Sequence, residues 1–307
     1  MRHIEVTVRR SPRGCRPWLA ATAIACLCLT GLKAYPQGQT AGLVLVELNC
    51  ENLFDCLHDT LKDDTEFLPD GIRKWTPRRY WRKLNNIGQE LLSCHSRTPD
   101  LVALVEVEND TVMRDLTRRS LLRNAGYRYV MTSSPDPRGL DVAFMWLPSS
   151  FRLLRHDTFA VAPLPGMRPT RDIMYVQGET CSGDTLHIFV VHAPSRYGGE
   201  RNTRPYRLQV ARRLLPLIEG LGGGNVVVAG DFNDYADSRS LLALYGAGLV
   251  NATAAATGSH GARATYRYRG EWRSIDHVLL SQRMSARADT AYVNDAPFLL
   301  EDDRRYG

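Results

Sequence analysis

NVVVAGDFND, residues 225–234, joins an apolar run to a cluster of polar side chains. The run up to Ala229 predicts a buried strand, and Gly230 frees the backbone just before Asp231, Asn233 and Asp234. Asp and Asn are common in turns for structural reasons alone. Carboxylate and amide oxygens are also the ligands that a hard cation such as Mg²⁺ prefers. The junction therefore has a structural and a functional interpretation, and the rest of the chain must decide between them.

Similar junctions recur along the chain. Apolar runs end at Asn49 and at Glu106, His192 follows a third run, and Asp276 lies inside a later one. Polar groups at successive strand ends can converge on one rim of a sheet, where α/β proteins commonly bind ligands. A phosphate ester held there needs charge neutralisation, an activated water and an acid for the leaving group. The repeated pattern favours a metal-assisted phosphoester site.

Short apolar runs alternate with helical patterns from residue 42 onward, an order typical of α/β proteins. Thr76-Pro77 indicates a helix start, because proline is favoured at the first helical position. No linker divides this region, so we expect one domain over residues 42–307. The expected strands are 43–48, 101–105, 142–146, 173–177, 186–191, 226–229 and 275–280, and the expected helices are 77–93, 111–124 and 206–219.

Taken in order, five short motifs resemble those of the endonuclease/exonuclease/phosphatase family, the deoxyribonuclease I-like superfamily. The motifs are Asn49-x-Glu51-Asn52, LVEV at 104–107, VHAPSR at 191–196, GDFN at 230–233 and Ile275-Asp276. The resemblance runs from about residue 43 to residue 280, and a bacterial exported member is the type of protein it suggests. It implies a four-layer sandwich of two mixed β-sheets packed face to face, with helices outside.

The resemblance also implies roles for individual residues. Glu106 is similar to the main metal carboxylate of the family, with Asn49 beside it, and the implied cofactor is Mg²⁺ or Mn²⁺. His192 resembles one of two histidines that act on the phosphate and its leaving group. Asp231 matches the residue that orients or deprotonates the attacking water, and Asn233 matches a phosphate or metal contact.

Three further roles follow from the resemblance, and one of them lacks its partner. Asp141 is expected to orient His192, Arg171 to contact the substrate phosphate, and Asp276 to pair with a second histidine. In the family that histidine belongs to a terminal Ser-Asp-His segment followed by a core strand, and the 307 residues contain no such segment. We therefore expect the last core strand to be missing and the activity to be low. The chain is then either C-terminally incomplete or a complete relative with an impaired active site.

Each of these residues also has an ordinary structural explanation. Asn49 could simply end a strand, and Glu106 and His192 could lie in solvated loops. Arg171 could be a surface ion-pair residue of little energetic importance. His277 points away from Asp276 by strand alternation, so it receives no role. The order of the motifs, rather than any single residue, favours the functional interpretation.

The substrate class stays open among several phosphoesters. A nuclease acting on DNA or RNA is favoured by the basic, aromatic stretch RATYRYRGEWR, residues 263–273, although an edge hairpin would look similar. A phosphatase or a sphingomyelinase-like lipid phosphodiesterase fits the same core. A catalytically dead binding module is the rival from another class, because the terminal histidine is absent.

The first 34 residues differ from the rest and predict a signal peptide. Basic residues precede an apolar run at 18–32, which is short for a membrane span, and Ala34 is a possible cleavage point. We expect an exported monomer without a stable membrane span; a lipoprotein processed at Cys26 or a retained anchor is the alternative. Cleavage would remove six of the 39 basic residues and one of the 33 acidic ones, lowering the net charge from +6 to +1. The basic composition is thus no evidence for nucleic-acid binding.

Four of the seven cysteines lie beyond this segment, at 50, 56, 94 and 181. An exported chain can oxidise them, and Cys50 and Cys56 are close enough in sequence to bridge a loop. We therefore expect a possible Cys50–Cys56 disulfide beside Asn49. None of the four has zinc-like sequence spacing to another Cys or His.

Overall fold

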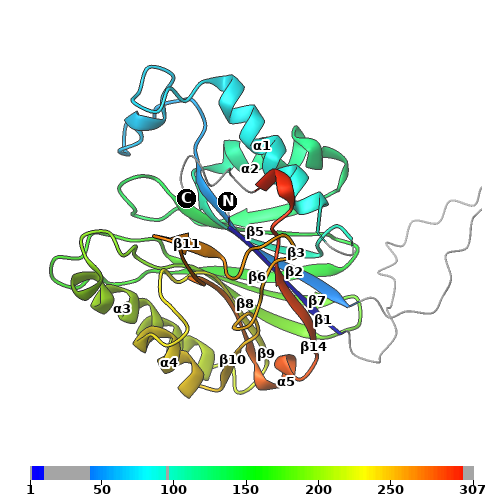
Figure 1. The fold of residues 1–307 in the computed structure, drawn as a ribbon. Helices are drawn as coiled ribbons and strands as arrows, with labels where there is room; N and C mark the ends of the chain where they lie inside the picture. Colours follow the sequence, from blue (N-terminus) through cyan, green and yellow to red (C-terminus); the bar gives the residue numbers. More distant parts are fainter. Residues whose placement is uncertain (1, 10–41, 95–96, 300–307) are drawn as a thin grey trace, which may run out of the picture.

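The computed structural model describes residues 2–9, 42–94 and 97–299. Within these residues, two six-stranded sheets pack face to face, and helices cover the outer face of each sheet (Figure 1). The arrangement is the expected four-layer sandwich of mixed sheets. Among the described residues, no helix combines the length and apolar character needed to cross a membrane.

The first sheet has the strand order β14-β1-β2-β3-β5-β4, and the second has the order β10-β13-β9-β8-β7-β6. The strands of the first sheet are β1 Arg2–Val8, β2 Leu43–Leu53, β3 Leu101–Val107, β4 Arg128–Met131, β5 Asp141–Trp146 and β14 Ala288–Val293. Those of the second are β6 Phe151–Phe159, β7 Ile173–Thr180, β8 Thr185–His192, β9 Asn225–Asp231, β10 Leu249–Asn251 and β13 Asp276–Ser281. A separate hairpin is formed by β11 Tyr266–Tyr268 and β12 Glu271–Arg273.

The helices are α1 Pro77–Leu92, α2 Asp110–Arg118, α3 Glu200–Glu219, α4 Arg239–Gly246 and α5 Gln282–Ser285. Short 3-10 turns occur at Thr65–Phe67, Leu121–Asn124 and Pro297–Leu299. α1 begins at the predicted proline and buries Leu84, Ile87 and Leu91 at helical spacing. α1 and α2 pack on the first sheet, whereas α3 and α4 pack on the second.

Three apolar layers hold the sandwich together. The central layer lies between the sheets, a second lies under α1 and α2, and a third lies under α3 and α4. Because both of their faces are covered, β3 and β9 are buried along nearly their whole length, which explains their unbroken apolar runs.

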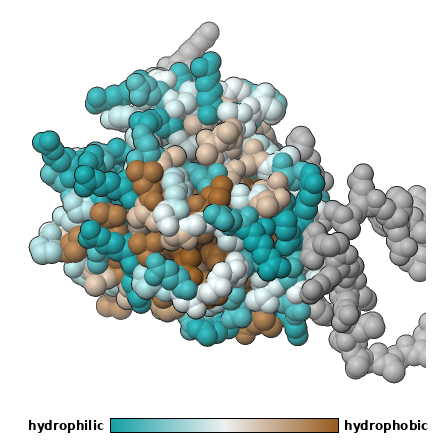
Figure 2. All heavy atoms as spheres, turned by 90° about the horizontal axis from the view of Figure 1, so that it is seen from below, coloured by the Kyte–Doolittle hydropathy of each residue, from teal (hydrophilic) through white to brown (hydrophobic). Residues whose placement is uncertain are grey.

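Surface apolar side chains include Leu242 of α4 and Val250 of β10. Seen from below, brown hydrophobic areas lie among teal hydrophilic ones (Figure 2).

The N-terminal strand is the main departure from the sequence expectation. β1 lies between β2 and β14 and pairs antiparallel with both, so that dark-blue β1 runs beside red β14 in Figure 1. Its side chains Ile4, Val6 and Val8 are buried in the central layer. In this structure residues 2–8 are thus part of the first sheet, and the expected domain start at residue 42 and the signal peptide stay predictions. Cleavage after Ala34 would remove β1, although the apolar run 18–32 and Cys26 lie outside the described residues.

This strand also bears on the expectation that the last core strand is missing, which stays a prediction. The first sheet has six strands among the described residues, and the position next to β2 is taken by β1 from the opposite end of the chain. The sequence did not predict this place for β1, because β1 and β14 are paired across about the full length of the chain, as Ile4 with Val293 shows. Such a non-local pairing leaves no local signal in the sequence.

The expected Cys50–Cys56 disulfide is also absent, since both residues are free thiols in the structure. Cys50 is fully buried within β2 and packs in the layer under α1. β2 continues through an irregularity at Glu51 and Asn52 to Leu53, before the loop that carries Cys56. Cys50 and Cys56 are close in sequence, but their side chains do not have the geometry that a disulfide requires.

Candidate active site

The polar residues predicted from the strand ends do converge. Asn49 on β2 lies in register with Val105, the residue before Glu106 on β3. In the second sheet, His192 pairs in register with Asp231, and Asp231 pairs in register with Asp276 on β13. The two sheets therefore present their polar strand ends to one another at the same edge of the sandwich.

Asn49 connects the two sheets at this edge. Its side-chain nitrogen Nδ2 donates to Glu106 Oε1 at 3.1 Å and to Asp231 Oδ2 at 3.0 Å. Its oxygen Oδ1 accepts the backbone N–H of Glu51 at 2.7 Å. Asn49 is fully buried, so the orientation of its amide is set by these three bonds rather than by solvent.

His192 completes a cluster that could hold a metal ion. Its Nε2 lies 3.8 Å from Glu106 Oε1 and 4.0 Å from Asp231 Oδ2. The ligand atoms of Glu106, His192 and Asp231 all lie within 4.8 Å of one another. His192 and Asp231 are buried and Glu106 is partly exposed, which leaves one side of the cluster open.

The backbone around the cluster is strained. Glu51, Asn52, Glu106 and Asn233 have φ values of 54°, 61°, 62° and 51°, although none is a glycine. Left-handed backbone in such residues is uncommon and tends to occur at functional sites. At Glu106 the ladder with β5 shifts register, and the Asn52 N–H donates to Glu106 Oε2 at 2.7 Å. The bulge turns the Glu106 side chain toward Asn49.

Gly230 allows the close approach of β8 and β9 beside Asp231. Its φ is 147°, and a Cβ built on it would lie 1.8 Å from the carbonyl oxygen of Val191. Only glycine fits this position without moving the main chain of β8. The glycine in the opening motif is therefore needed to bring Asp231 level with His192.

Arg171 and Asn233 hold the loop that follows His192. Arg171 Nη2 and Asn233 Nδ2 both donate to the carbonyl of Ala193, at 3.0 and 3.1 Å. Arg171 also makes a buried ion pair with Asp136, at 2.9 Å. The surface ion-pair explanation of Arg171 is thus wrong, while its expected contact with the substrate phosphate stays a prediction.

Asp141 and Asp276 are both buried. Asp141 Oδ1 accepts hydrogen bonds from Thr132 Oγ1 at 2.6 Å and from the Ser134 N–H at 2.9 Å. Its expected role in orienting His192 stays a prediction. Asp276 faces Asp231 in the β9–β13 ladder, and its expected pairing with a second histidine stays a prediction.

Two neighbours of these residues have structural partners. His277 Nε2 contacts the carbonyl of Asp234 at 2.9 Å, and burial lowers the pKa of His277 to about 4. The imidazole is therefore neutral and contacts structural partners, and the expectation that it has no catalytic role stays a prediction. Asp234, the last acid of the opening motif, accepts from buried Arg207 at 2.6 Å, and so anchors α3 rather than the site.

Sequence reasoning missed Lys83 of α1. Its Nζ donates to the backbone carbonyls of Glu51 and Asn52, the latter at 2.9 Å, and so supports the strained loop. Desolvation lowers the pKa of Lys83 to about 8, although the nearby Cys50 and Glu106 oppose the shift. No local pattern reports this contact, because the lysine lies 31 positions from Asn52.

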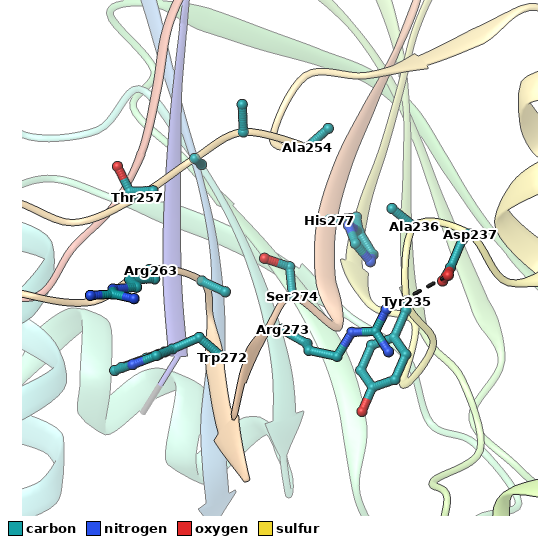
Figure 3. A pocket seen from close by; sticks show the side chains of 13 residues that line it. Tyr235, Ala236, Asp237, Ala254, Thr257, Arg263, Trp272, Arg273, Ser274 and His277 are labelled. Carbon is teal, nitrogen blue, oxygen red and sulfur yellow. Dashed lines mark ion pairs between the residues drawn. The ribbon is translucent and has the colours of Figure 1, made fainter. Parts of the chain in front are cut away.

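A pocket of about 310 Å³ adjoins the chain segments of the site (Figure 3). Its walls include residues that follow β9 and residues that precede β13, the strands that carry Asp231 and Asp276. Tyr235 and Arg273 lie on one side, Arg263 and Trp272 on the other. The Arg273 guanidinium lies over the Tyr235 ring at 3.9 Å from its centroid.

Comparisons with known proteins agree with this architecture. A family model described as the endonuclease/exonuclease/phosphatase family matches residues 44–303. No curated protein matches the chain significantly. A functionally unknown conserved protein from Enterococcus faecalis V583 is 15% identical, with a TM-score of 0.53 over 72% of this chain and 84% of that one.

Two structures from Bacteroides thetaiotaomicron show the same fold. A mannosyl-6-phosphatase is 16% identical, with a TM-score of 0.50 over 66% of this chain and 78% of that one. An endonuclease/exonuclease/phosphatase family protein is 17% identical, with a TM-score of 0.50 over 66% and 75%. Because the family model spans most of the chain, this protein belongs to the endonuclease/exonuclease/phosphatase family, whose members are hydrolases of phosphoric esters and generally depend on a divalent metal ion.

Proposed function

We propose that this protein is a Mg²⁺- or Mn²⁺-dependent phosphodiesterase that hydrolyses nucleic acid. The observation that carries the proposal is the cluster of Glu106, His192 and Asp231, joined across the sheets by Asn49. Arginine and aromatic side chains on the segments that follow His192 and Asp231 and precede Asp276 favour a nucleic acid over a small phosphoester.

The donor set of the cluster fits a hard divalent cation. Glu106 and Asp231 offer carboxylate oxygens, the ligands that Mg²⁺ and Mn²⁺ prefer, and His192 Nε2 lies in the same 4.8 Å group beside them, where it can transfer a proton. A bound ion would supply charge neutralisation at the phosphate and a water of lowered pKa. The open side at partly exposed Glu106 is where the phosphate would enter.

The chain's own residues would position the reacting groups. Asp231 is held through both oxygens, because Oδ1 accepts the Asn233 N–H at 2.7 Å and Oδ2 accepts the Asn49 amide at 3.0 Å. A carboxylate held in this way can orient an attacking water. His192 Nε2 faces the same space and can transfer a proton to or from the phosphate oxygens.

Nucleic acid is favoured by the side chains over Tyr235. The guanidinium of Arg196, on the loop after His192, lies 4.2 Å from the Tyr235 centroid, and that of Arg273 lies 3.9 Å away. In the nearby hairpin, the rings of Tyr266 and Tyr268 stack at 6.2 Å. Guanidinium groups and aromatic faces in this combination bind phosphodiester backbones and stack bases without sequence preference.

The test compares substrates in the presence of Mg²⁺, Mn²⁺ or a chelator. Labelled single-stranded DNA and RNA, bis-p-nitrophenyl phosphate and p-nitrophenyl phosphate represent a polymer, a small diester and a monoester. We expect metal-dependent cleavage of the polymer and the diester, with losses of about 10²–10⁴-fold in His192→Ala and in Asp231→Asn. Arg114→Ala, an exposed residue of α2, is the unaffected control.

A second variant separates the nuclease from a general diesterase. Tyr268→Ala, which removes an exposed ring of the hairpin, should lower kcat/KM on single-stranded DNA about 5- to 100-fold, the effect of one lost stacking contact, and leave the small diester unchanged. Turnover of the monoester alone would replace the proposal with a phosphatase. Metal binding without any turnover would replace it with a binding module.

A further inference from the structure

A second cluster of potential metal ligands lies on the other face of the first sheet. Along β1, Ile4, Val6 and Val8 point into the layer between the sheets, so alternation turns His3 and Glu5 toward the helices. There they meet Cys94, two residues beyond the end of α1 and part of the layer under that helix. The ligand atoms of His3, Glu5 and Cys94 lie within 4.8 Å of one another.

The distances around His3 match those of a tetrahedral zinc ligand. Cys94 Sγ lies 3.6 Å from His3 Nε2. Zinc bonds of about 2.3 Å to sulfur and about 2.0 Å to nitrogen, at a tetrahedral angle, place the two ligand atoms about 3.6 Å apart. Sulfur and nitrogen are therefore already at the spacing that one shared zinc ion requires.

The second nitrogen of His3 has the partner that metal-bound histidines usually have. His3 Nδ1 lies 3.3 Å from Glu90 Oε1, on the last turn of α1. The contact is an ion-pair distance without hydrogen-bond geometry in this structure; a carboxylate in this place would accept the remaining ring N–H of a ligating histidine and so fix its tautomer and orientation. Tyr292 of β14 donates from its hydroxyl to Glu5 Oε2, which holds the Glu5 carboxylate in place.

The cluster is buried too deeply to be an ordinary surface group. Exposed fractions are 1% for His3, 1% for Glu5, 0% for Glu90 and 7% for Cys94. Among the described residues, neither carboxylate oxygen of Glu90 has a hydrogen-bond partner, and no lysine or arginine forms an ion pair with Glu5 or Glu90. Buried carboxylates are costly without a compensating cation, and a metal ion bound here would offset that cost.

We propose that His3, Glu5 and Cys94 bind a structural zinc ion, with Glu90 orienting the His3 ring. One thiolate, one imidazole and one carboxylate suit Zn²⁺ and disfavour Mg²⁺, which prefers oxygen ligands alone. Three protein ligands leave one tetrahedral position for water. The bound ion would connect β1 to the end of α1. This proposal does not depend on the proposed function of the active site.

The experiment uses the full 307-residue chain, purified without chelator, with its N-terminus verified by intact mass. Metal content after dialysis against Zn²⁺ or Mg²⁺ is measured by elemental analysis. We expect about one zinc per chain at this site, a thiolate-to-cobalt absorption band when Co²⁺ replaces zinc, and a Tm that rises with added Zn²⁺.

Paired variants separate this site from other thiols and from the active site. His3→Gln and Cys94→Ser should each lose the zinc and the rise in Tm, and Cys94→Ser should also lose the cobalt band. Cys181→Ser, a buried cysteine in another part of the fold, and Glu106→Gln should keep all three. Circular dichroism shows whether each variant folds; Glu5→Gln replaces any that does not. Three results would each overturn the proposal. They are a folded full-length chain that binds no zinc, zinc binding that is unchanged in all three ligand variants, and a purified chain that lacks residues 2–8.

Discussion

Asn49 on β2 donates a hydrogen bond to Asp231 on β9 at 3.0 Å, and so spans the interface between the two sheets. The same amide nitrogen donates to Glu106 on β3 at 3.1 Å. The two carboxylates of the active site, which come from different sheets, are therefore set relative to one another by one buried side chain. The active site thus forms only when the two sheets pack together.

Asn49→Ala should weaken Mg²⁺ binding about 10- to 100-fold, the usual effect of removing a group that orients metal ligands. Without the amide, Glu106 and Asp231 repel each other and lose their fixed separation. Calorimetric titration with Mg²⁺ measures the change, and Asn85→Ala on the surface of α1 is the matched control. An unchanged dissociation constant would show that Asn49 does not organise the carboxylates.

Gly230→Ala should destabilise the fold by more than about 2 kcal/mol. The new methyl group would meet the Val191 carbonyl oxygen at 1.8 Å, on a backbone with φ of 147°. Chemical denaturation measures the free energy of unfolding. Gly246→Ala is the control, because open space surrounds that position, and it should be neutral or add about 0.4–1 kcal/mol.

Ile4→Ala should cost about 2–5 kcal/mol if β1 is part of the folded protein, because Ile4 is fully buried between the sheets. Arg9→Ala, whose side chain is 73% exposed, should change stability by less than about 0.5 kcal/mol. Removal of residues 1–34 should leave β2 and β14 without their shared neighbour and promote aggregation. A truncated chain as stable as the full one would instead favour the signal-peptide interpretation.

Glu108 should make stability fall as the pH rises toward 8. Burial raises the pKa of Glu108 to about 8, even though the hydrogen bond from the Asp55 N–H at 2.6 Å lowers it in part. Because the folded state binds this proton more tightly than the unfolded state, the stabilisation is complete below about pH 4.5 and is lost through about pH 8. Denaturant unfolding of Glu108→Gln between pH 5 and 8 should show a smaller decline than the parent. Parallel pH profiles would contradict the assignment.

Local patterns in the sequence were sufficient for the α/β class, for most buried strands and for the positions of Asn49, Glu106, His192 and Asp231. Each of these features depends on neighbours within a few positions: an apolar run, a glycine and the polar residue that ends a strand. The structure keeps all four residues at one edge of the sandwich, as the order of the motifs predicted.

Tertiary structure alone decided the features that join remote parts of the chain. The pairing of β1 with β14, which links Ile4 to Val293, is one such feature, and the signal peptide expected over residues 1–34 stays a prediction. The support of the strained loop by Lys83 and the ion pair between Arg171 and Asp136 likewise join separate elements. Periodicity is set by the backbone geometry of each segment, whereas these contacts depend on how the two sheets and their helices pack, and so no local pattern contains them.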